Sequence, residues 1–239
     1  MYTPASPRSY WALIAAAGLS TRMGTAVPKQ YLKLGDKTVL EHTLGVFDRH
    51  EQITGIVVVL SAHDHFWKST ALAFNKPLFT VTGGDERAKS VLNGLNFLEN
   101  NAQPQDWVLV HDAARPCLRS SDIDKLIQVC QTLTQGGAIL AMPVSDTLKE
   151  VDSHTNIIKT LNRNHLWRAL TPQMFPISVL SQALSQVISR GLTVTDEAAA
   201  MEHSGQNVKI VPGNHDNIKI TQQSDLGLAE LFLKEQGRI

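Results

Sequence analysis

Residues 12–29 read Ala-Leu-Ile-Ala-Ala-Ala-Gly-Leu-Ser-Thr-Arg-Met-Gly-Thr-Ala-Val-Pro-Lys. The stretch begins as an apolar run without alternation, which is typical of a strand buried on both faces of a parallel sheet. Small residues around Gly18 then let the backbone approach a ligand closely, and two cations, Arg22 and Lys29, follow. Backbone N–H groups and cations in such a loop are suited to holding polyphosphate. The alternative that this stretch leaves open is a packed strand end whose two cations are simply solvated.

Two common phosphate-binding loops do not fit this stretch. A P-loop requires Gly-x-x-x-x-Gly-Lys-Ser/Thr, whereas Lys29 follows Pro28 and precedes Gln30. The dinucleotide fingerprint requires Gly-x-Gly-x-x-Gly, and Ser20 stands where the second glycine would be. Neither standard motif therefore explains the loop.

The composition is that of an ordinary globular protein. Among 239 residues, 22 Lys and Arg balance 22 Asp and Glu, which argues against general binding of nucleic acid or of a membrane. No apolar run approaches the length of a membrane span. Residues 1–9 are polar and lack the apolar segment of a signal peptide, so we expect a cytoplasmic location.

The cysteines and histidines give little support for a disulfide framework or a metal site. Cys117 and Cys130 form no Cys-x-x-Cys motif, and Cys130 falls on the apolar stripe of an expected helix. No His-Glu-x-x-His pair occurs, and His63 and His65 in a polar segment are weak evidence for a metal site. We therefore expect no metal held by protein ligands alone.

Apolar runs alternate with amphipathic segments through the first 142 residues. After the strand that opens near Ala12, the expected strands are 55–60, 77–82, 107–110 and 136–142. The expected helices lie at about 39–49, 63–74, 88–98 and 123–133, the last opened by a capping box of Ser121 and Asp124. This alternation predicts an α/β fold, a Rossmann-like and mostly parallel sheet with helices on both faces.

The pattern changes after the fifth strand. Two extended, partly polar runs at 147–151 and 157–161 flank a turn-forming segment, which predicts a projecting β-hairpin arm. Beyond the arm we expect a helix from about 176 to 188, a short helix at 195–204, a strand at 208–211 and a helix near 223–235. We interpret residues 1–239 as a single domain interrupted by an arm at about 145–164.

Three unusual loops follow expected strands, at 18–29, 83–90 and 111–116. Ligands of open α/β sheets bind beyond the carboxyl ends of the strands, so these loops together predict a nucleotide site. Asp112 could face a metal-bound phosphate or a substrate hydroxyl there, or could simply cap the turn or pair with Arg115. No motif for a covalent nucleophile is present. Direct displacement at phosphorus needs only positioning and positive charge, which Arg22, Lys29 and a phosphate-bound magnesium ion would supply.

Short motifs along the chain carry a family resemblance. They are Ala-Ala-Gly at 16–18 with Arg-Met at 22–23, Pro-Lys-Gln-Tyr-Leu at 28–32, Gly-Gly-Asp-Glu-Arg at 83–87, Val-His-Asp-Ala-Ala-Arg-Pro at 110–116, Leu-Thr-Pro-Gln at 170–173, Thr-Asp-Glu-Ala at 195–198 and Asp-Asn-Ile-Lys at 216–219. In this order the sequence resembles the 2-C-methyl-D-erythritol 4-phosphate cytidylyltransferases of the non-mevalonate isoprenoid pathway. The resemblance covers nearly the whole chain, and the motifs at 28–32 and 110–116 are its most specific ones.

The resemblance implies a nucleotidyltransferase that transfers CMP from CTP to 2-C-methyl-D-erythritol 4-phosphate. The substrate phosphate would attack the α-phosphate in line and release pyrophosphate. The implied cofactor is Mg²⁺ or another divalent cation, held mainly by the CTP phosphates with Asp112 nearby. The family is a homodimer whose arms reach into the partner's site, and neither nucleic acid nor membrane is an implied partner.

The resemblance also implies roles for particular residues. The positions matching catalytic residues are Arg22, Lys29, Arg163 and Lys219. The positions matching contacts to the cytidine nucleotide are Ala16, Ala17, Gly18, Gly84, Asp85, Ser90, Asp112 and Ala113. The positions matching substrate-binding surroundings are Thr147, Arg163, Thr195, Asp216 and Lys219.

The sequence departs from the family pattern at two positions, and it leaves three alternative functions to compare. Ala15 stands where the family often has Pro, and Ser20 where it often has Gly.

A cytidylyltransferase for another alditol phosphate, such as ribitol 5-phosphate, is the nearest alternative. An NAD-type oxidoreductase is disfavoured by the missing glycine fingerprint. A non-catalytic nucleotide sensor is disfavoured by the second cationic pair, Arg163 and Lys219.

Overall fold

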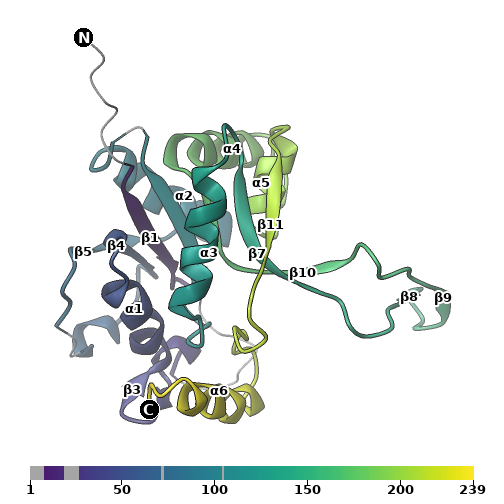
Figure 1. Cartoon of the computed structure of the whole chain (residues 1–239), viewed down its shortest axis with the longest axis horizontal. Helices are drawn as coiled ribbons and strands as arrows, with labels where there is room; N and C mark the ends of the chain where they lie inside the picture. Colours follow the sequence, from purple (N-terminus) through teal and green to yellow (C-terminus); the bar gives the residue numbers. More distant parts are fainter. Residues whose placement is uncertain (1–7, 19–26, 71–72, 104) are drawn as a thin grey trace.

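The apolar runs form strands of one central sheet (Figure 1). The structure, a computed structural model, describes residues 8–18, 27–70, 73–103 and 105–239. In this part of the chain the sheet has seven strands in the order β11-β7-β10-β6-β1-β4-β5. Their bounds are β1 Tyr10–Ala15, β4 Ile53–Leu60, β5 Leu78–Thr82, β6 Trp107–Asp112, β7 Gly137–Pro143, β10 Trp167–Pro176 and β11 Val208–Pro212.

Most neighbouring strands of the sheet run parallel, as the sequence predicts. β1 pairs in parallel with both β4 and β6, β4 with β5, and β7 with β11. β10 is the exception, because it runs antiparallel to β6 on one side and β7 on the other. The mostly parallel α/β fold is therefore confirmed, with one antiparallel strand inserted among the parallel ones.

Helices cover both faces of the sheet. Their bounds are α1 Val39–Arg49, α2 Arg87–Glu99, α3 Ser120–Gln131, α4 Ile177–Ser189, α5 Glu197–His203 and α6 Ser224–Glu235. Alternate residues of β1 face opposite ways: Ala12 and Ile14 belong to the apolar cluster under α1 and α3, whereas Trp11 and Leu13 belong to the cluster under α2, α4 and α5. Fully burying a large apolar side chain contributes about 1.5–3 kcal/mol, so both layers are held mainly by these contacts.

Two local predictions were wrong. The expected α-helix at 63–74 is represented in the described residues only by the 3-10 turn η3, Trp67–Ser69. Asp64 accepts hydrogen bonds from the amides of Phe66 and Trp67, each at 2.9 Å, and such a side-chain turn competes with helix formation. The expected capping box of α3 is also absent, because α3 begins at Ser120 without a side-chain cap and Asp124 lies 3.2 Å from His50 instead.

Both cysteines are buried within the folded chain. Cys130 belongs to the apolar cluster under α1 and α3, as the sequence predicts, and Cys117 packs beneath α6. Burial raises the pKa of each thiol to about 12. Both cysteines are free thiols, so no disulfide links them.

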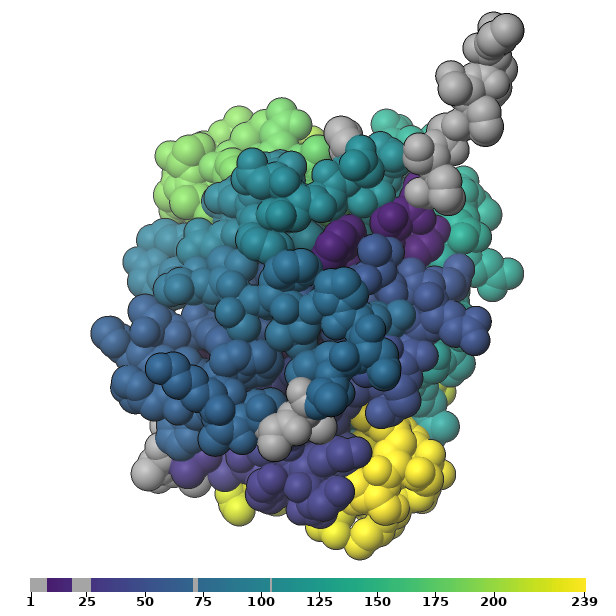
Figure 2. Space-filling model, turned by 90° about the vertical axis from the view of Figure 1, so that its left-hand side faces the viewer, coloured from purple at the N-terminus to yellow at the C-terminus, as the bar shows by residue number. Residues whose placement is uncertain are grey.

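The C-terminal helix α6 packs against the segment that follows the first loop. There β2 (Lys33–Leu34) and β3 (Lys37–Thr38) form a small hairpin after the 3-10 turn η2 (Lys29–Tyr31). Leu34 and Val39 share an apolar cluster with Ala229 and Leu233 of α6. Figure 2 shows the C-terminal segment in yellow beside the violet segment at the lower edge of the molecule.

The arm projects away from the sheet (Figure 1). It carries the antiparallel pair β8 (Lys149–Val151) and β9 (Ile157–Thr160), close to the two predicted runs. Three of its apolar side chains are about half-exposed or more: Val151, Ile157 and Ile158. No helix in the described part of the chain is long and apolar enough to cross a membrane.

We expect opposite effects from alanine at two glycines. In β7, a Cβ at Gly137 would overlap the Met174 carbonyl oxygen and the Phe175 ring, so Gly137→Ala should lower the free energy of unfolding by about 2 kcal/mol or more. In α6, a Cβ at Gly227 would meet nothing within 4 Å, so Gly227→Ala should raise it by about 0.5–1 kcal/mol. Urea denaturation of both variants measures the difference, and a neutral Gly137→Ala would contradict this packing.

Candidate active site

A cavity of about 630 Å³ lies beyond the carboxyl ends of β1, β4, β5 and β6. The chain passes from β1 to β4 on one side and later returns to β6 on the other, so the cavity occupies a topological switch point of the sheet. The described parts of the three loops singled out in the sequence meet there, with Gly18 and Lys29 representing the first loop. The predicted residues that line the cavity are Ala16, Ala17, Gly18, Lys29, Gly84, Asp85, Ser90, Asp112, Ala113 and Lys219.

The first wall of the cavity is the loop after β1. The buried side chain of Gln30 donates hydrogen bonds to the carbonyl oxygens of Ala16, at 2.9 Å, and Gly18, at 3.3 Å. The motif at 28–32 therefore supplies Lys29 to the cavity, and through Gln30 it also holds the segment after β1 in place. Arg22 and Ser20 lie outside the residues that the structure describes.

The second wall is the turn between β5 and α2. The Ser90 hydroxyl accepts a hydrogen bond from the Gly84 amide at 3.1 Å and so closes the turn. A Cβ at Gly83 would lie 2.8 Å from both Ala17 Cβ and Ser90 Oγ, so only glycine lets this turn approach the first loop. Asp85 is exposed and pairs with Lys89 at 2.9 Å.

Asp112, the last residue of β6, forms ion pairs with three cationic side chains. Its Oδ1 lies 3.3 Å from Arg87 Nη2, while Oδ2 lies 2.8 Å from Lys219 Nζ and 3.5 Å from Arg115 Nε. Burial would raise the pKa of Asp112, but the three positive charges outweigh burial and hold it well below its ordinary value. The pairing with Arg115 that the sequence suggested is thus one part of a larger charge cluster.

Arg87 joins this cluster to α5. Its guanidinium binds Glu197 through two contacts, Nη1 to Oε1 at 2.5 Å and Nη2 to Oε2 at 3.1 Å. Glu197 is fully buried, so the pair holds the start of α2 against α5. Neither Arg87 nor Glu197 was predicted as a site residue, although each belongs to a motif quoted above. Arg87 and Glu197 are far apart in the sequence, so the sequence did not indicate that their side chains form an ion pair.

His111 holds the backbone of the Asp112 turn through a chain of hydrogen bonds. Its Nε2 faces the Arg115 carbonyl at 3.1 Å and must donate, because a carbonyl only accepts. Nδ1 therefore accepts from the Thr171 hydroxyl at 2.8 Å, and that hydroxyl accepts from the Asp112 amide at 3.2 Å. Complete burial lowers the pKa of His111 to about 4, so the ring is neutral near pH 7.

Comparison with known proteins identifies the family. The model of the 2-C-methyl-D-erythritol 4-phosphate cytidylyltransferase family matches residues 10–235. The chain belongs to this family. A cytidylyltransferase of that name from Tolumonas auensis is 50% identical over 230 residues, covering 96% of this chain and 98% of the relative. One from Vibrio vulnificus is 47% identical, covering 97% of each chain.

Solved structures agree with this assignment. The crystal structure of a 4-diphosphocytidyl-2C-methyl-D-erythritol synthase is 40% identical and has a TM-score of 0.82, covering 96% of this chain and 100% of the other. That of the Francisella tularensis 2-C-methyl-D-erythritol 4-phosphate cytidylyltransferase is 34% identical, also with a TM-score of 0.82, covering 94% and 100%. The chain is therefore an enzyme of the nucleotidyltransferase class.

Four residues that the family resemblance pointed to do not line this cavity. Thr147 and Arg163 lie exposed on the arm, where Arg163 donates to the Ser145 carbonyl. Thr195 is exposed just before α5. Asp216 is buried and accepts from Arg119 Nε at 2.6 Å and from Gln236 Nε2 at 2.8 Å. Their roles in this member of the cytidylyltransferase family stay predictions.

The cavity offers few oxygens to a metal ion. Within the described ranges, no three His, Cys, Asp or Glu side chains are arranged to hold one. Three carboxylates line the cavity, and Asp85 and Asp112 among them are already bonded to cations. A magnesium ion at this site would therefore take most of its ligands from nucleotide phosphates.

We expect His111 to make stability depend on pH. Its pKa is about 4 in the folded chain and 6.5 ordinarily, so between these values only the unfolded chain binds the proton. The stabilisation is complete above pH 6.5 and is lost as the pH falls. His111→Gln should lower the free energy of unfolding at pH 7. Between about pH 4 and pH 6.5, it should also reduce the slope of that free energy against pH by about 1.4 kcal/mol per pH unit. Urea denaturation at several pH values tests this, and equal slopes would contradict it.

Proposed function

We propose that the protein transfers CMP from CTP to 2-C-methyl-D-erythritol 4-phosphate and releases pyrophosphate. The observation that carries the proposal is the meeting of three loops around one cavity, in a chain of this family. The cavity places Lys29 and Lys219 together with two glycine-bounded turns. That combination of lysine cations and closely approaching backbone suits a nucleoside triphosphate.

The reaction asks the protein for position and positive charge. A phosphate oxygen of the substrate attacks the α-phosphorus, and the bond to the bridging oxygen of the β-phosphate breaks as its electrons move to pyrophosphate. In this proposal Arg22 and Lys29 stabilise the charge that develops on the leaving group. Lys219 and Arg163 position the substrate phosphate for attack in line with that bond.

The nucleotide would lie along the walls already described. We assign the cytidine contacts to the small residues at 16–18 and to Gly84, Asp85, Ser90, Asp112 and Ala113, all of which line the cavity. Fixed donors and acceptors on such walls reject a base whose exocyclic group leaves a buried polar group unpaired. The site should therefore prefer CTP to UTP and ATP.

We also propose Mg²⁺ as the cofactor, bound mainly to the triphosphate. Support comes from the carboxylates of the cavity, since Asp112 already balances three cations and Asp85 pairs with Lys89. The ion would offset the negative charge of the phosphates. The residues of the chain would hold the nucleotide that carries it.

The protein acts, in this proposal, as one nucleotidyltransferase domain that dimerises through the arm at 145–164. The arm exposes Val151, Ile157 and Ile158, and a two-stranded hairpin has little stability of its own. Arg163 and Thr147 are absent from the lining of their own chain's cavity, which supports a role for both in the partner's site. A twofold dimer would supply each cavity with one arm.

We expect a pyrophosphate-release assay to identify both substrates. Crossing CTP, UTP and ATP against 2-C-methyl-D-erythritol 4-phosphate and ribitol 5-phosphate should give the highest kcat/KM for CTP with the methylerythritol phosphate. Each mismatched substrate should be about 100-fold poorer, because it leaves polar groups of the site unpaired. A preference for ribitol 5-phosphate would favour the alternative alditol phosphate, and equal rates with UTP would contradict base selection.

We expect activity to return when two inactive variants form mixed dimers. Lys29→Ala and Arg163→Ala homodimers should each be nearly inactive. In a mixed dimer, one site collects both defects while the other combines wild-type Lys29 with wild-type Arg163 from the partner. Random assembly from equal amounts should restore roughly a quarter of all sites.

Purified mixed dimers make this comparison direct. With a different tag on each variant, the purified mixed dimer should have about half of its sites active. If Arg163 acted within its own chain, every site of that dimer would carry one defect. No recovery of activity would then rule out the shared site.

A further inference from the structure

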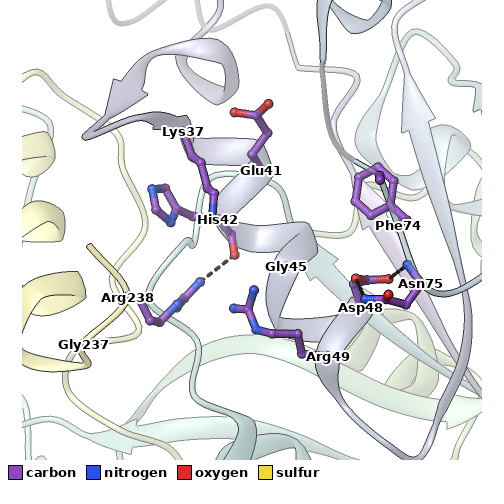
Figure 3. Close-up of a pocket in the computed structure, with 11 residues that line it drawn as sticks. Lys37, Glu41, His42, Gly45, Asp48, Arg49, Phe74, Asn75, Gly237 and Arg238 are labelled. Atoms are coloured by element: carbon purple, nitrogen blue, oxygen red, sulfur yellow. Dashed lines mark hydrogen bonds between the residues drawn. The ribbon is translucent and has the colours of Figure 1, made fainter.

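A second cavity, of about 440 Å³, lies between α1, the segment at 73–75 and the end of the chain (Figure 3). It shares no lining residue with the nucleotide cavity. Its walls carry Lys37 from β3, Arg49 from α1 and Arg238 from the C-terminal segment. Three cations of separate elements thus face one space.

The acidic groups of this cavity are already occupied. Glu41 accepts from the Thr38 amide at 2.5 Å as part of the cap of α1. Asp48 accepts from the backbone amide of Asn75 at 2.8 Å and from its side-chain amide at 2.9 Å, as Figure 3 shows. Among the described residues, no ion pair involves Lys37, Arg49 or Arg238. The three cations of the lining outnumber its two carboxylates, so the cavity carries a net positive charge.

Arg238 is held there by neutral groups. Its Nη2 donates to the His42 carbonyl at 2.6 Å, and its Nη1 donates to the Pro116 carbonyl at 2.7 Å. Its Nε is buried without a hydrogen-bond partner. Burial, followed by the charge of Arg49, lowers the pKa of Arg238 to about 10. Arg238 is partly buried beside a second cation, Arg49, so a bound anion would stabilise both charges.

Arg49 is turned toward the same space. A Cβ at Gly45 would lie 3.0 Å from Arg49 Nη1, so glycine at this position leaves room for the guanidinium beside the helix. Figure 3 shows this guanidinium folded back along α1, on the side from which Arg238 enters. The guanidinium groups of Arg49 and Arg238 are planar and carry several N–H donors, so they can bind phosphate oxygens more specifically than lysine ammonium groups can.

We propose that this cavity binds a phosphate group between Arg49 and Arg238, with Lys37 adding positive charge at its edge. The ligand is either free inorganic phosphate or a small phosphate monoester, and the cavity has room for both. The site is separate from the proposed catalytic chemistry. It nevertheless contacts the same turn, because Arg238 holds Pro116 and Thr43 Oγ1 of α1 donates to the Ala113 carbonyl at 2.9 Å.

Amide chemical shifts of the full chain test this proposal. Inorganic phosphate, and separately glycerol 3-phosphate, is added at constant ionic strength, and the signals of Gly45 and Gly237 are followed. We expect saturable shifts at both glycines with at least one ligand. Saturation by glycerol 3-phosphate alone assigns the site to a monoester, and saturation by phosphate alone assigns it to the free anion.

Three variants separate the site from its surroundings. Arg49→Gln should weaken binding about tenfold or more, because it removes a charged donor, whereas the exposed Arg190→Gln should leave binding unchanged. Lys29→Ala, which alters the nucleotide cavity, should retain the shifts at Gly45 and Gly237. Shifts confined to residues of the nucleotide cavity, a lack of saturation, or equal affinity in Arg49→Gln would overturn the proposal.

Discussion

The ionised carboxylate of Asp112 is the group on which the arrangement of the site depends. It lies at the end of a central strand and binds cations from the start of α2, from its own turn and from the C-terminal loop. These elements are far apart in sequence, and their positive charges would repel one another without it. Breaking such a cluster leaves buried charges uncompensated, which costs several kcal/mol. The ion pair between Asp112 and Lys219 therefore joins the C-terminal loop to the end of β6 and also keeps Lys219 at the cavity.

Features of the fold that depend on local sequence could be predicted. The uniform apolar runs located strands near β4, β6 and β7, since each is buried on both faces. The helix at 39–49 was predicted at its observed bounds, because an apolar stripe there coincides with a strong helix start. The three loops met as expected, because parallel strands place their carboxyl ends at one edge of the sheet.

Features that depend on distant partners could not be predicted. β10 contains Pro172 and Pro176, and prolines argue against a central strand. Its pairing with β7 is interrupted between Ala169 and Gln173, so the strand spans a break in the ladder that includes Pro172. The pairing of Arg87 with Glu197 and the chain from His111 through Thr171 likewise join residues that only the folded chain brings together. In each case the sequence showed the motif but did not show which distant residue the motif contacts.

The arm leaves and re-enters the sheet at one place, because Pro143 at the end of β7 pairs with Trp167 at the start of β10. The segment between them can gain or lose residues without shifting the register of either strand. The tip of the arm, between β8 and β9, can therefore change in length and surface while Thr147, Arg163 and the Asp112 cluster keep their places.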